Sequence, residues 1–334
     1  MTEFLDICYD AIKRQDQAIS RTLDIVDDEA AKLIDKTKQI ILVGCGDSYA
    51  VADYGRWAFL KVGLNAYVVS PNEIRDLQLT KDTVVIGISA SGRSLVTIDA
   101  IQRAKAMGAT SVVLTDDKNG PASQEADHVW VTKSGVETYN TSPSAPTTTA
   151  MAYLLAVSAG VTNDLGGVLE QDIEQLKSAG KDLLTWAERE GVTISEMTSP
   201  DVPVYLISDG PNYVAAEIGM MKFNEFSVLK GVAVIREEFR HHWVLSINKD
   251  ESAVLVTESS VDHSDDVYMD VLRNSLGMRA YHLHIDDKFG LKLPLVQAIP
   301  NAIALQMAAY HSVLKFDPEK DAFKQPHADA FKIY

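Results

Sequence analysis

The sequence predicts an α/β protein built as two similar units in tandem, each a doubly wound parallel sheet flanked by helices. Short runs of β-branched residues alternate with helical stretches, and landmarks of the first half recur in the second half. Alternating strands and helices imply parallel pairing through right-handed crossovers. A chain of 334 residues with 46% hydrophobic content is large enough to fill two ordinary domain cores.

The first half has the clearest alternation. After a helical N-terminal region, an apolar strand is followed by a glycine turn, a helix, two further strands, a second helix and a fourth strand. A long polar loop then precedes another apolar helix. The expected segments are a helical region 1–37, strands 39–43, 66–69, 83–88 and 111–114, helices 48–62 and 95–107, a loop 134–149, and a helix from about residue 150.

The second half repeats this outline. A long helix, 168–198, precedes a new strand, 202–207, and a helix, 213–227. The turn ending at Gly46 is matched by one ending at Gly210, and Gly108 is matched by Gly277 at nearly the same displacement, so we infer two copies of one unit. The domain limits predicted here are 1–165 for the N-terminal helix and first domain, 166–200 for a helical linker, and 201–334 for the second domain with its C-terminal tail.

Composition narrows the functional classes. A net charge of −16, from 31 basic and 47 acidic residues, argues against a nucleic-acid-binding surface. The acidic start is not typical of a signal peptide, and no apolar run reaches the roughly 20 residues that span a bilayer. The two cysteines, Cys8 and Cys45, form no disulfide framework. We therefore expect a soluble, cytoplasmic protein that binds neither nucleic acid nor membrane.

The most informative stretch is the turn 89–94, Ser-Ala-Ser-Gly-Arg-Ser, which lies between the strand 83–88 and the helix 95–107. Such a turn presents backbone N–H groups and the positive end of a helix dipole, and its serine hydroxyls add donors. The turn Gly44–Ser48 follows another strand and lies at the same edge of the sheet, where ligands bind in such folds. These features predict an anion site, with phosphate as the expected anion.

Nucleotide-binding alternatives fit less well. Gly44-x-Gly46 lacks the third glycine of the dinucleotide fingerprint, because Tyr49 occupies that place, and no acidic residue closes the strand 66–69. A Walker A loop is absent from the sequence. The loop 134–149 is either functional or simply solvated. In the second half the strand 253–256 runs into an acidic residue, Glu258, so we expect one phosphate ligand per chain.

Ionisable residues of the second half offer candidates for proton transfer. Lys222 and Glu225 share a helix face, so they form either a surface ion pair or part of a site. Of the adjacent His241 and His242, which point in different directions, at most one is expected to be catalytic. His282 and His284 share a strand face without an obvious third metal ligand, so we expect no metal site.

Three linked motifs resemble those of the sugar isomerase (SIS) domain family, in particular the isomerase half of glucosamine-6-phosphate synthases. The resemblance extends over about residues 35–334 and includes the sixteen-residue spacing from Glu225 to His241. It departs at Ala90 and Arg93, where the synthases have Gln and Glu, and no glutaminase domain is expected. The motifs are Gly44-x-Gly46-x-Ser48, Ser89-x-Ser91-Gly92-x-Ser94 and Glu217-x-Gly219-x-x-Lys222-x-x-Glu225.

The resemblance implies a role for each matching residue. Glu225 would move a proton between C1 and C2 with Lys222 nearby, His241 would open the sugar ring, and Lys332 is a weaker candidate from the C-terminal tail. His241 in this family is often lent by a partner subunit, which implies a homodimer. The residues implied to bind the sugar or its phosphate are Ser48, Ser89, Ala90, Ser91, Ser94, Glu137 and Ser142.

The implied activity is conversion of a hexose 6-phosphate or amino-hexose 6-phosphate by an isomerase, a deaminase or a deglycase. All three reactions proceed through ring opening and C1–C2 proton transfer, so the expectation includes no cofactor and no metal. The alternatives are a non-catalytic sensor of sugar phosphates and a bifunctional phosphoglucose/phosphomannose isomerase. The sequence does not determine which phosphosugar is used, or whether ammonia or an amine is released.

Overall fold

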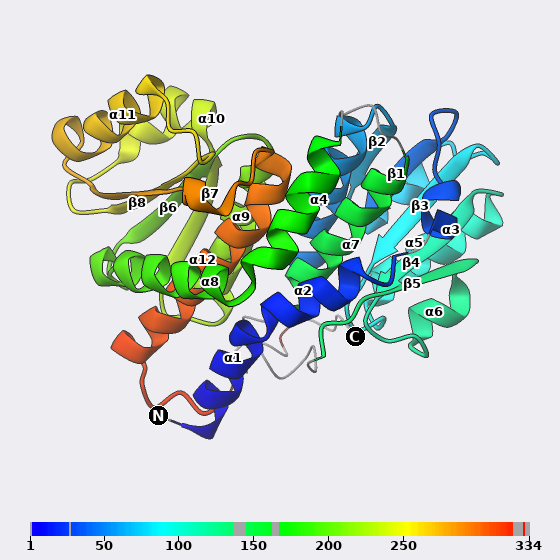
Figure 1. Cartoon of the computed structure of the whole chain (residues 1–334), viewed down its shortest axis with the longest axis horizontal. Coiled ribbons are helices and arrows are strands. Elements are labelled where there is room, and N and C mark those ends of the chain that lie inside the picture. The colour runs from blue at the N-terminus through cyan, green and yellow to red at the C-terminus, as the bar shows by residue number, and fades with distance from the viewer. Residues whose placement is uncertain (1, 27, 136–144, 162–166, 323–329, 331–334) are drawn as a thin grey trace. The chain divides into compact units, whose positions relative to one another are not determined.

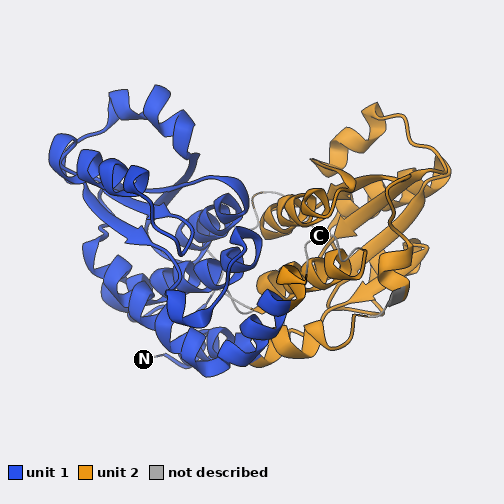
Figure 2. Cartoon of the chain, turned by 45° about the horizontal axis from the view of Figure 1, so that its top comes forward, with its two compact units in different colours: residues 1–16, 140–144, 171–323 blue, residues 17–139, 145–170, 324–334 orange. Residues whose placement is uncertain are grey.

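The computed structural model describes residues 2–26, 28–135, 145–161, 167–322 and 330. The chain forms two compact units, coloured separately in Figure 2, and each is described here by itself. The domain limits expected from the sequence stay a prediction. Unit 1 comprises residues 1–16, 140–144 and 171–323, and unit 2 comprises residues 17–139, 145–170 and 324–334.

Unit 2 contains a five-stranded parallel sheet with the strand order β2-β1-β3-β4-β5. Strands β1, β3 and β4 lie inside the sheet and are almost entirely buried, which explains their continuous runs of Val, Ile and Leu. In register, Gln39 pairs with Asn65 on one side and with Thr83 on the other. The strands are β1 (Gln39–Val43), β2 (Asn65–Val69), β3 (Thr83–Ile88), β4 (Thr110–Thr115) and β5 (His128–Val131).

Helices cover both faces of this sheet (Figure 1). The chain moves from β1 to β2 in one direction across the sheet and from β3 to β4 in the other, so right-handed crossovers place α4 and α5 on opposite faces. Helix α7 packs beside α4, and η1 packs beside α5. The helices are α2 (Gln15–Leu23), α3 (Asp28–Lys32), α4 (Asp47–Lys61), η1 (Pro71–Asp76), α5 (Leu95–Ala106), α6 (Pro121–Glu125) and α7 (Ala145–Val161).

Unit 1 contains a four-stranded parallel sheet with the order β7-β6-β8-β9. This is the order of β2-β1-β3-β4 in unit 2, and Gly46 and Gly210 follow the equivalent strands with the same positive φ of 55°. The internal repeat predicted from the sequence is therefore confirmed by the topology. The strands are β6 (Pro203–Ser208), β7 (Lys230–Ile235), β8 (Ser252–Val256) and β9 (Arg279–Leu283).

The unit 1 sheet is also covered on both faces. Helix α9 packs on β6 and β7, and α12 packs against α9, whereas α10 and α11 belong to the opposite face. Helix α1, from the start of the chain, packs on α12. The helices are α1 (Glu3–Lys13), α8 (Val168–Met197), α9 (Gly210–Glu225), α10 (Arg236–His241), η2 (Trp243–Ser246), α11 (His263–Asp270), η3 (Val271–Ser275), η4 (Asp287–Phe289) and α12 (Pro294–Phe316).

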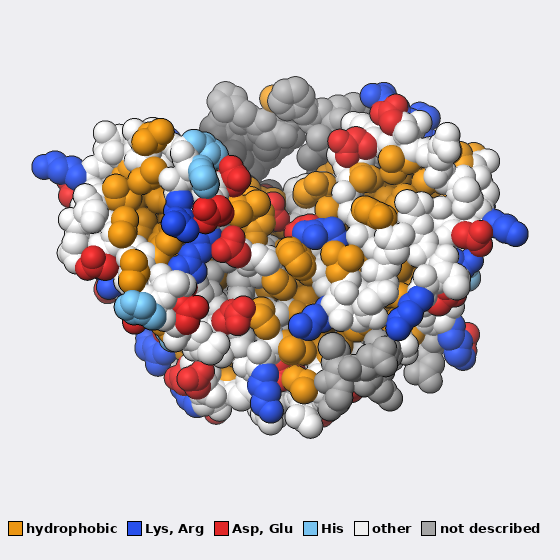
Figure 3. Space-filling view, turned by 90° about the horizontal axis from the view of Figure 1, so that it is seen from above, with side chains coloured by type: hydrophobic (Ala, Val, Ile, Leu, Met, Phe, Trp, Pro, Cys, Tyr) orange, Lys and Arg blue, Asp and Glu red, His pale blue; other side chains and the backbone are white. Residues whose placement is uncertain are grey.

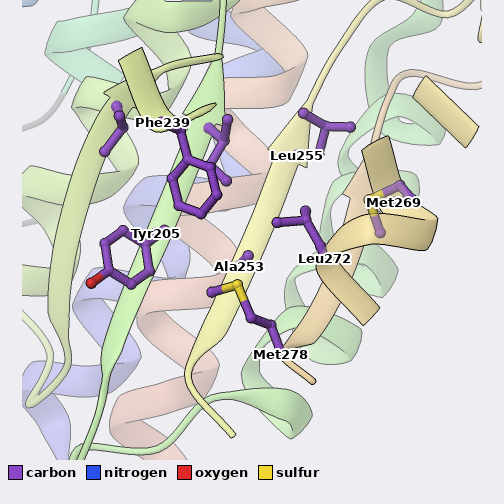
Figure 4. Packing of buried hydrophobic residues seen from close by; sticks show 9 residues of the cluster. Tyr205, Phe239, Ala253, Leu255, Met269, Leu272 and Met278 are labelled. Atoms are coloured by element: carbon purple, nitrogen blue, oxygen red, sulfur yellow. The ribbon is translucent and has the colours of Figure 1, made fainter. Parts of the chain in front are cut away.

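A core of aromatic, aliphatic and sulfur-containing side chains joins α10, α11 and η3 to the unit 1 sheet (Figure 4). Tyr205 of β6 meets Phe239 of α10 edge to face, with ring centroids 5.7 Å apart, and Phe239 is fully enclosed. Each large apolar side chain buried in this way contributes about 1.5–3 kcal/mol to folding. Through Phe239 the cluster attaches α10, the helix that ends at His241, to the unit 1 sheet.

Several elements differ from the sequence-based expectation. The helical region 1–37 is three helices rather than one, with a break at Arg14, and α8 is kinked at Gly180, whose φ is 42°. Helix α7 starts at Ala145 instead of about 150, because Pro146 favours the first turn of a helix. Among the described helices, none combines the length and apolar character needed to cross a membrane.

Candidate functional site

The serine turn and the Gly44–Ser48 turn meet at the topological switch point of the unit 2 sheet, where neighbouring strands β1 and β3 send the chain in opposite directions. Ligands of doubly wound sheets bind at this point. The Oγ of Ser94 lies 3.8 Å from the Sγ of Cys45, so the two turns contact each other. The structure thus brings together the two stretches that the sequence predicted to share one edge.

Hydrogen bonds to the end of β4 fix the serine turn. The backbone N–H of Ser89 donates to the carbonyl of Leu114 (3.0 Å), and the carbonyl of Ala90 accepts from the Thr115 hydroxyl (3.1 Å) and the Asp116 N–H (3.0 Å). Ser89 and Ser91 are both buried. The turn is preorganised, so a ligand would meet donors that are already in place.

The first turn of α5 adds backbone donors. Ser94 is the N-cap residue, yet its side chain makes no capping bond to the helix backbone and instead accepts from the Thr97 hydroxyl (3.1 Å). No acidic residue occurs in the first turn of this helix. The positive end of the dipole is therefore not offset by the helix's own side chains, which favours an anion there.

The glycine turn brings α4 close to the end of β1. A Cβ on Gly44 would lie 2.3 Å from the carbonyl oxygen of Ser48, so only glycine fits. Ser48 is half-buried in the first turn of α4, and its N–H donates to the Cys45 carbonyl (3.0 Å). Asp47 accepts a hydrogen bond from the Thr147 hydroxyl (3.0 Å), which connects the turn to α7.

In unit 1, Lys222 and Glu225 form an ion pair near the end of α9. The Lys222 side chain is only 3% exposed, whereas Glu225, the last residue of the helix, is 38% exposed. The pairing predicted from their spacing is confirmed, but it is not a surface pair, because the ammonium is buried. A buried ammonium thus holds a partly exposed carboxylate in position, an arrangement suited to a positioned proton acceptor.

His241 lies at the end of α10, with its side chain 70% exposed. Its Nε2 is 3.1 Å from a carboxylate oxygen of Glu237, and the neighbouring His242 pairs in the same way with Glu238 at 3.6 Å. The contacts that the structure gives for His241 thus stay on α10 and do not include Glu225. The structure does not bring these two candidates together within unit 1.

Three sequence-predicted site residues, Glu137, Ser142 and Lys332, lie outside the described residues. Arg93 is described and exposed, and its backbone N–H donates to the Oγ of Ser91 (3.3 Å). The contact between Cys45 and Ser94 was not predicted from the sequence. Its position in the sequence could have indicated this contact, because Cys45 stands between Gly44 and Gly46 in the turn that follows β1.

The equivalent switch point of unit 1 is built differently. The Ser208 hydroxyl donates to the Val256 carbonyl (2.7 Å), and the backbone and side chain of Ser259 are both held by the buried Gln297. Burial raises the pKa of Asp209, and burial together with His284 lowers the pKa of His282 to about 4. The hydroxyls of Ser208 and Ser259 here serve internal hydrogen bonds.

No group of three or more His, Cys, Asp or Glu side chains within the described ranges is arranged to hold a metal ion. His282 and His284 do lie close together, with ring centroids 5.0 Å apart. His282 is engaged by the hydroxyl oxygen of Thr257, 2.7 Å from its Nε2. The Nε2 of His282 is thus already hydrogen-bonded within the protein.

Comparison with known proteins agrees with this architecture. A model of the SIS domain matches residues 33–162, which include β1, α4, the serine turn and α7. Residues 33–162 are a SIS domain. Since the unit 1 sheet repeats the strand order of this domain, the chain carries two SIS-type units in tandem.

The SIS-domain chain is similar to glutamine–fructose-6-phosphate aminotransferase (isomerizing) of Francisella tularensis, with 28% identity over 269 residues, 73% of this chain and 43% of that protein. The chain thus spans less than half the length of this curated relative. Its fold matches the C-terminal domain of glucosamine-fructose-6-phosphate aminotransferase from Francisella tularensis (TM-score 0.77, 22% identity, 92% and 94% of the two chains). It also matches glucosamine-6-phosphate deaminase from Thermotoga maritima (TM-score 0.75, 16% identity, 96% and 97%).

Proposed function

We propose that this SIS protein is an enzyme that converts a hexose 6-phosphate or an amino-hexose 6-phosphate by ring opening and C1–C2 proton transfer. The observation that carries the proposal is the Lys222–Glu225 pair, in which a buried ammonium positions a partly exposed carboxylate. The names of its relatives, an isomerizing aminotransferase and an amino-sugar-phosphate deaminase, support the same substrate class. Isomerase, deaminase and deglycase reactions all remain within this proposal.

The proposed steps assign one task to each group. The hydroxyls of Ser89, Ser91 and Ser94, with the Ala90 backbone and the first-turn amides of α5, hold the phosphate. His241 opens the sugar ring by proton transfer at the ring oxygen, and Glu225 then takes the proton from C2 and returns it to C1 through an enediol-type intermediate. Lys222 keeps the Glu225 carboxylate in position, and Ser48 contacts the sugar.

We further propose that the enzyme is a homodimer. Unit 1 exposes apolar side chains on three neighbouring stretches of the chain. Leu245 of η2, which directly follows His242, is 84% exposed, and further apolar side chains are exposed at the end of β7 and on α11. Figure 3 shows hydrophobic side chains exposed among charged ones on the face that it presents. A second copy covering this surface would bury these side chains and bring His241 to a subunit boundary.

The decisive experiment follows hydrogen exchange at C1 and C2 of fructose 6-phosphate and glucosamine 6-phosphate in D₂O by NMR, alongside assays for ammonia and for ketose–aldose conversion. The Glu225→Gln variant should lose exchange by about 10²- to 10⁴-fold, because the proton acceptor is gone. Glu174→Gln is the matched control, since Glu174 also pairs with a lysine three positions away on a helix, Lys177 at 3.4 Å, but on an exposed face of α8.

Undiminished exchange in the Glu225→Gln variant would show that another group is the base. A wild-type protein that binds these phosphosugars but never exchanges the proton would instead support the sensor alternative. Interconversion of glucose, mannose and fructose 6-phosphates without activity on amino sugars would support the bifunctional isomerase.

A further inference from the structure

Three ionisable side chains of α10 form a connected group that includes the His241 ring. Glu237 precedes His241 by about one helical turn, so both side chains lie on the same face of the helix. One carboxylate oxygen of Glu237 lies 3.1 Å from Nε2 of His241, and the other accepts a hydrogen bond from Nη1 of Arg240 at 2.9 Å. Both oxygens of this carboxylate are therefore engaged, which restricts its movement.

The contact with Glu237 determines which ring nitrogen of His241 carries the proton. An ionised carboxylate accepts hydrogen bonds but donates none, so the nitrogen that faces it, Nε2, is the protonated one. In the neutral ring the lone pair is then on Nδ1. Within the described part of the chain, the polar contact of the His241 ring is the one through Nε2. Nδ1 is thus the nitrogen left for a substrate.

His242 is held differently, although a glutamate also precedes it by four residues. Its Nδ1, rather than its Nε2, faces the carboxylate of Glu238, and the separation of 3.6 Å is longer than a hydrogen bond. His242 is also the C-cap of α10, with φ −139° and ψ −38°, so its backbone has left the helix. The two histidines therefore turn opposite nitrogens toward their glutamates, and of the two it is His241 that lies at hydrogen-bonding distance.

The value of the Glu237–His241 pair lies in orientation rather than in stability. The two side chains are 57% and 70% exposed, and exposed pairs of this kind contribute little to folding. The helix that carries them is anchored, because Phe239, which lies between them in the sequence, is buried in the unit 1 core. The carboxylate thus orients the ring from a fixed base, as proton transfer to a bound sugar requires.

We propose that Glu237 is a positioning residue for ring opening, which holds Nε2 of His241 so that Nδ1 exchanges protons with the sugar. The inference rests on the proposed function, in which His241 opens the ring. In the furanose of fructose 6-phosphate, Nδ1 takes the proton of the C2 hydroxyl and delivers it to the ring oxygen, as the C2–O5 bond breaks and the C2 carbonyl forms. The Glu237 carboxylate stabilises the imidazolium that exists between the two transfers.

A substrate that needs no ring opening isolates this step. 5-Deoxyfructose 6-phosphate cannot close a ring, because it lacks the C5 hydroxyl and its C6 oxygen is phosphorylated. Glu237→Gln should lower kcat/KM for fructose 6-phosphate by about 10-fold, the effect expected from losing one charged hydrogen-bonding partner. Hydrogen exchange at C1 of the 5-deoxy compound, followed by NMR in D₂O, should stay within about twofold of wild type, since Glu225 alone performs it.

Glu238→Gln is the matched control, because it removes a carboxylate from the next position of the same helix, where it faces His242. It should change neither reaction by more than about twofold. Equal losses of both reactions in Glu237→Gln would mean that the carboxylate supports the structure of α10 and not ring opening. Unchanged turnover of fructose 6-phosphate in Glu237→Gln, or the same selective loss in Glu238→Gln, would also overturn the inference.

The outcomes separate this inference from the proposed reaction. Loss of exchange on both substrates in Glu225→Gln, with unchanged turnover of fructose 6-phosphate in Glu237→Gln, would support the reaction and reject the role of Glu237. Undiminished exchange in Glu225→Gln, with the selective loss in Glu237→Gln, would reject the proposed base and support the positioning of His241. A wild-type protein that exchanges hydrogen in neither substrate would overturn both.

Discussion

His241 and His242 have nearly the same surroundings, although the proposed chemistry needs only one of them. Both are exposed, and each faces a glutamate four positions earlier, Glu237 and Glu238 respectively. Their rings leave the chain in different directions, so a substrate can meet only one in a productive geometry. The pair therefore offers an internal comparison in which charge, exposure and local partner are almost matched.

We expect His241→Asn to lower turnover of the cyclic phosphosugar by about 10²-fold or more, because proton transfer at the ring oxygen is lost. His242→Asn should retain turnover within a few-fold of wild type. Steady-state kinetics of both variants checks this. Equal losses in the two variants, or a larger loss in His242→Asn, would contradict the assignment of ring opening to His241.

For single residues, the spacing of side chains along the sequence predicts which of them pair, but not how deeply they are buried. Lys222 and Glu225 were expected to pair, and they do, but their spacing could not show that Lys222 is buried. Helix α9 is covered by β6 and β7 on one side and α12 on another, so even a lysine on it is enclosed. Small and hydroxyl residues after apolar strands were sufficient to locate the serine turn.

Among the elements, the β1–α4 turn depends on glycine for two separate reasons. Gly46 adopts a positive φ of 55°, whereas Gly44 is needed because any Cβ would overlap the Ser48 carbonyl. The second constraint is purely steric and involves backbone, which cannot swing aside as a side chain can. The approach of α4 to β1, and with it the position of Ser48, depends on this contact.

Gly44→Ala should therefore lower the free energy of unfolding by at least about 2 kcal/mol and weaken phosphate binding as α4 is displaced. Gly108→Ala is the control: its φ is 84° but no atom would lie within 4 Å of the new Cβ, so only backbone strain of about 1–2 kcal/mol applies. Urea unfolding and phosphate titration of both variants make the comparison. Unaltered phosphate affinity in a destabilised Gly44→Ala variant would separate the turn from the site.

Other elements could not be predicted from the sequence for a physical reason. Helix α12 is buried on nearly all sides, so it lacks the alternation of apolar and polar residues that marks a surface helix, and it contains Pro300. Strand β7 begins with Lys230 and Gly231, which weaken the strand signal. In both cases tertiary packing, rather than local pattern, determines the element.

For the molecule as a whole, the duplication was predictable because glycine turns recur at equivalent strand ends. The grouping of residues into units was not, since it depends on which surfaces α1 meets. Helix α1 packs on α12, and Gln15 and Gln306 form a buried hydrogen bond of 2.8 Å between their side-chain amides. From its place in the sequence, α1 would be assigned to the unit 2 sheet, whose strands come next in the chain. It belongs instead with the unit 1 sheet, whose first strand begins at Pro203.

Stability should also depend on pH through His282 in unit 1. Burial and the neighbouring His284 lower the pKa of His282 to about 4, below the usual 6.5. Between these values the unfolded chain binds a proton that the folded chain does not, so stability is complete above pH 6.5 and falls as the pH decreases toward 4. His311, whose pKa is also lowered by burial, acts in the same direction.

We therefore expect the free energy of unfolding, measured with urea, to fall between pH 7 and pH 5, and to fall less steeply in His282→Asn. The exposed His263→Asn should keep the wild-type slope. A slope that is the same in His282→Asn and in the wild type would show that His282 is not responsible for the pH dependence.

The pairing of α1 with α12 has a consequence for how the protein is made. The apolar face of α1, formed by Leu5, Cys8, Ala11 and Ile12, leaves the ribosome before the helix that covers it, α12, which ends at Phe316. While the residues between α1 and α12 are synthesised, this face has no native cover, even after the first sheet is complete. We expect ribosome-bound chains stalled before α12 to be captured by chaperones through the α1 face, and chains stalled after α12 has emerged to be captured less.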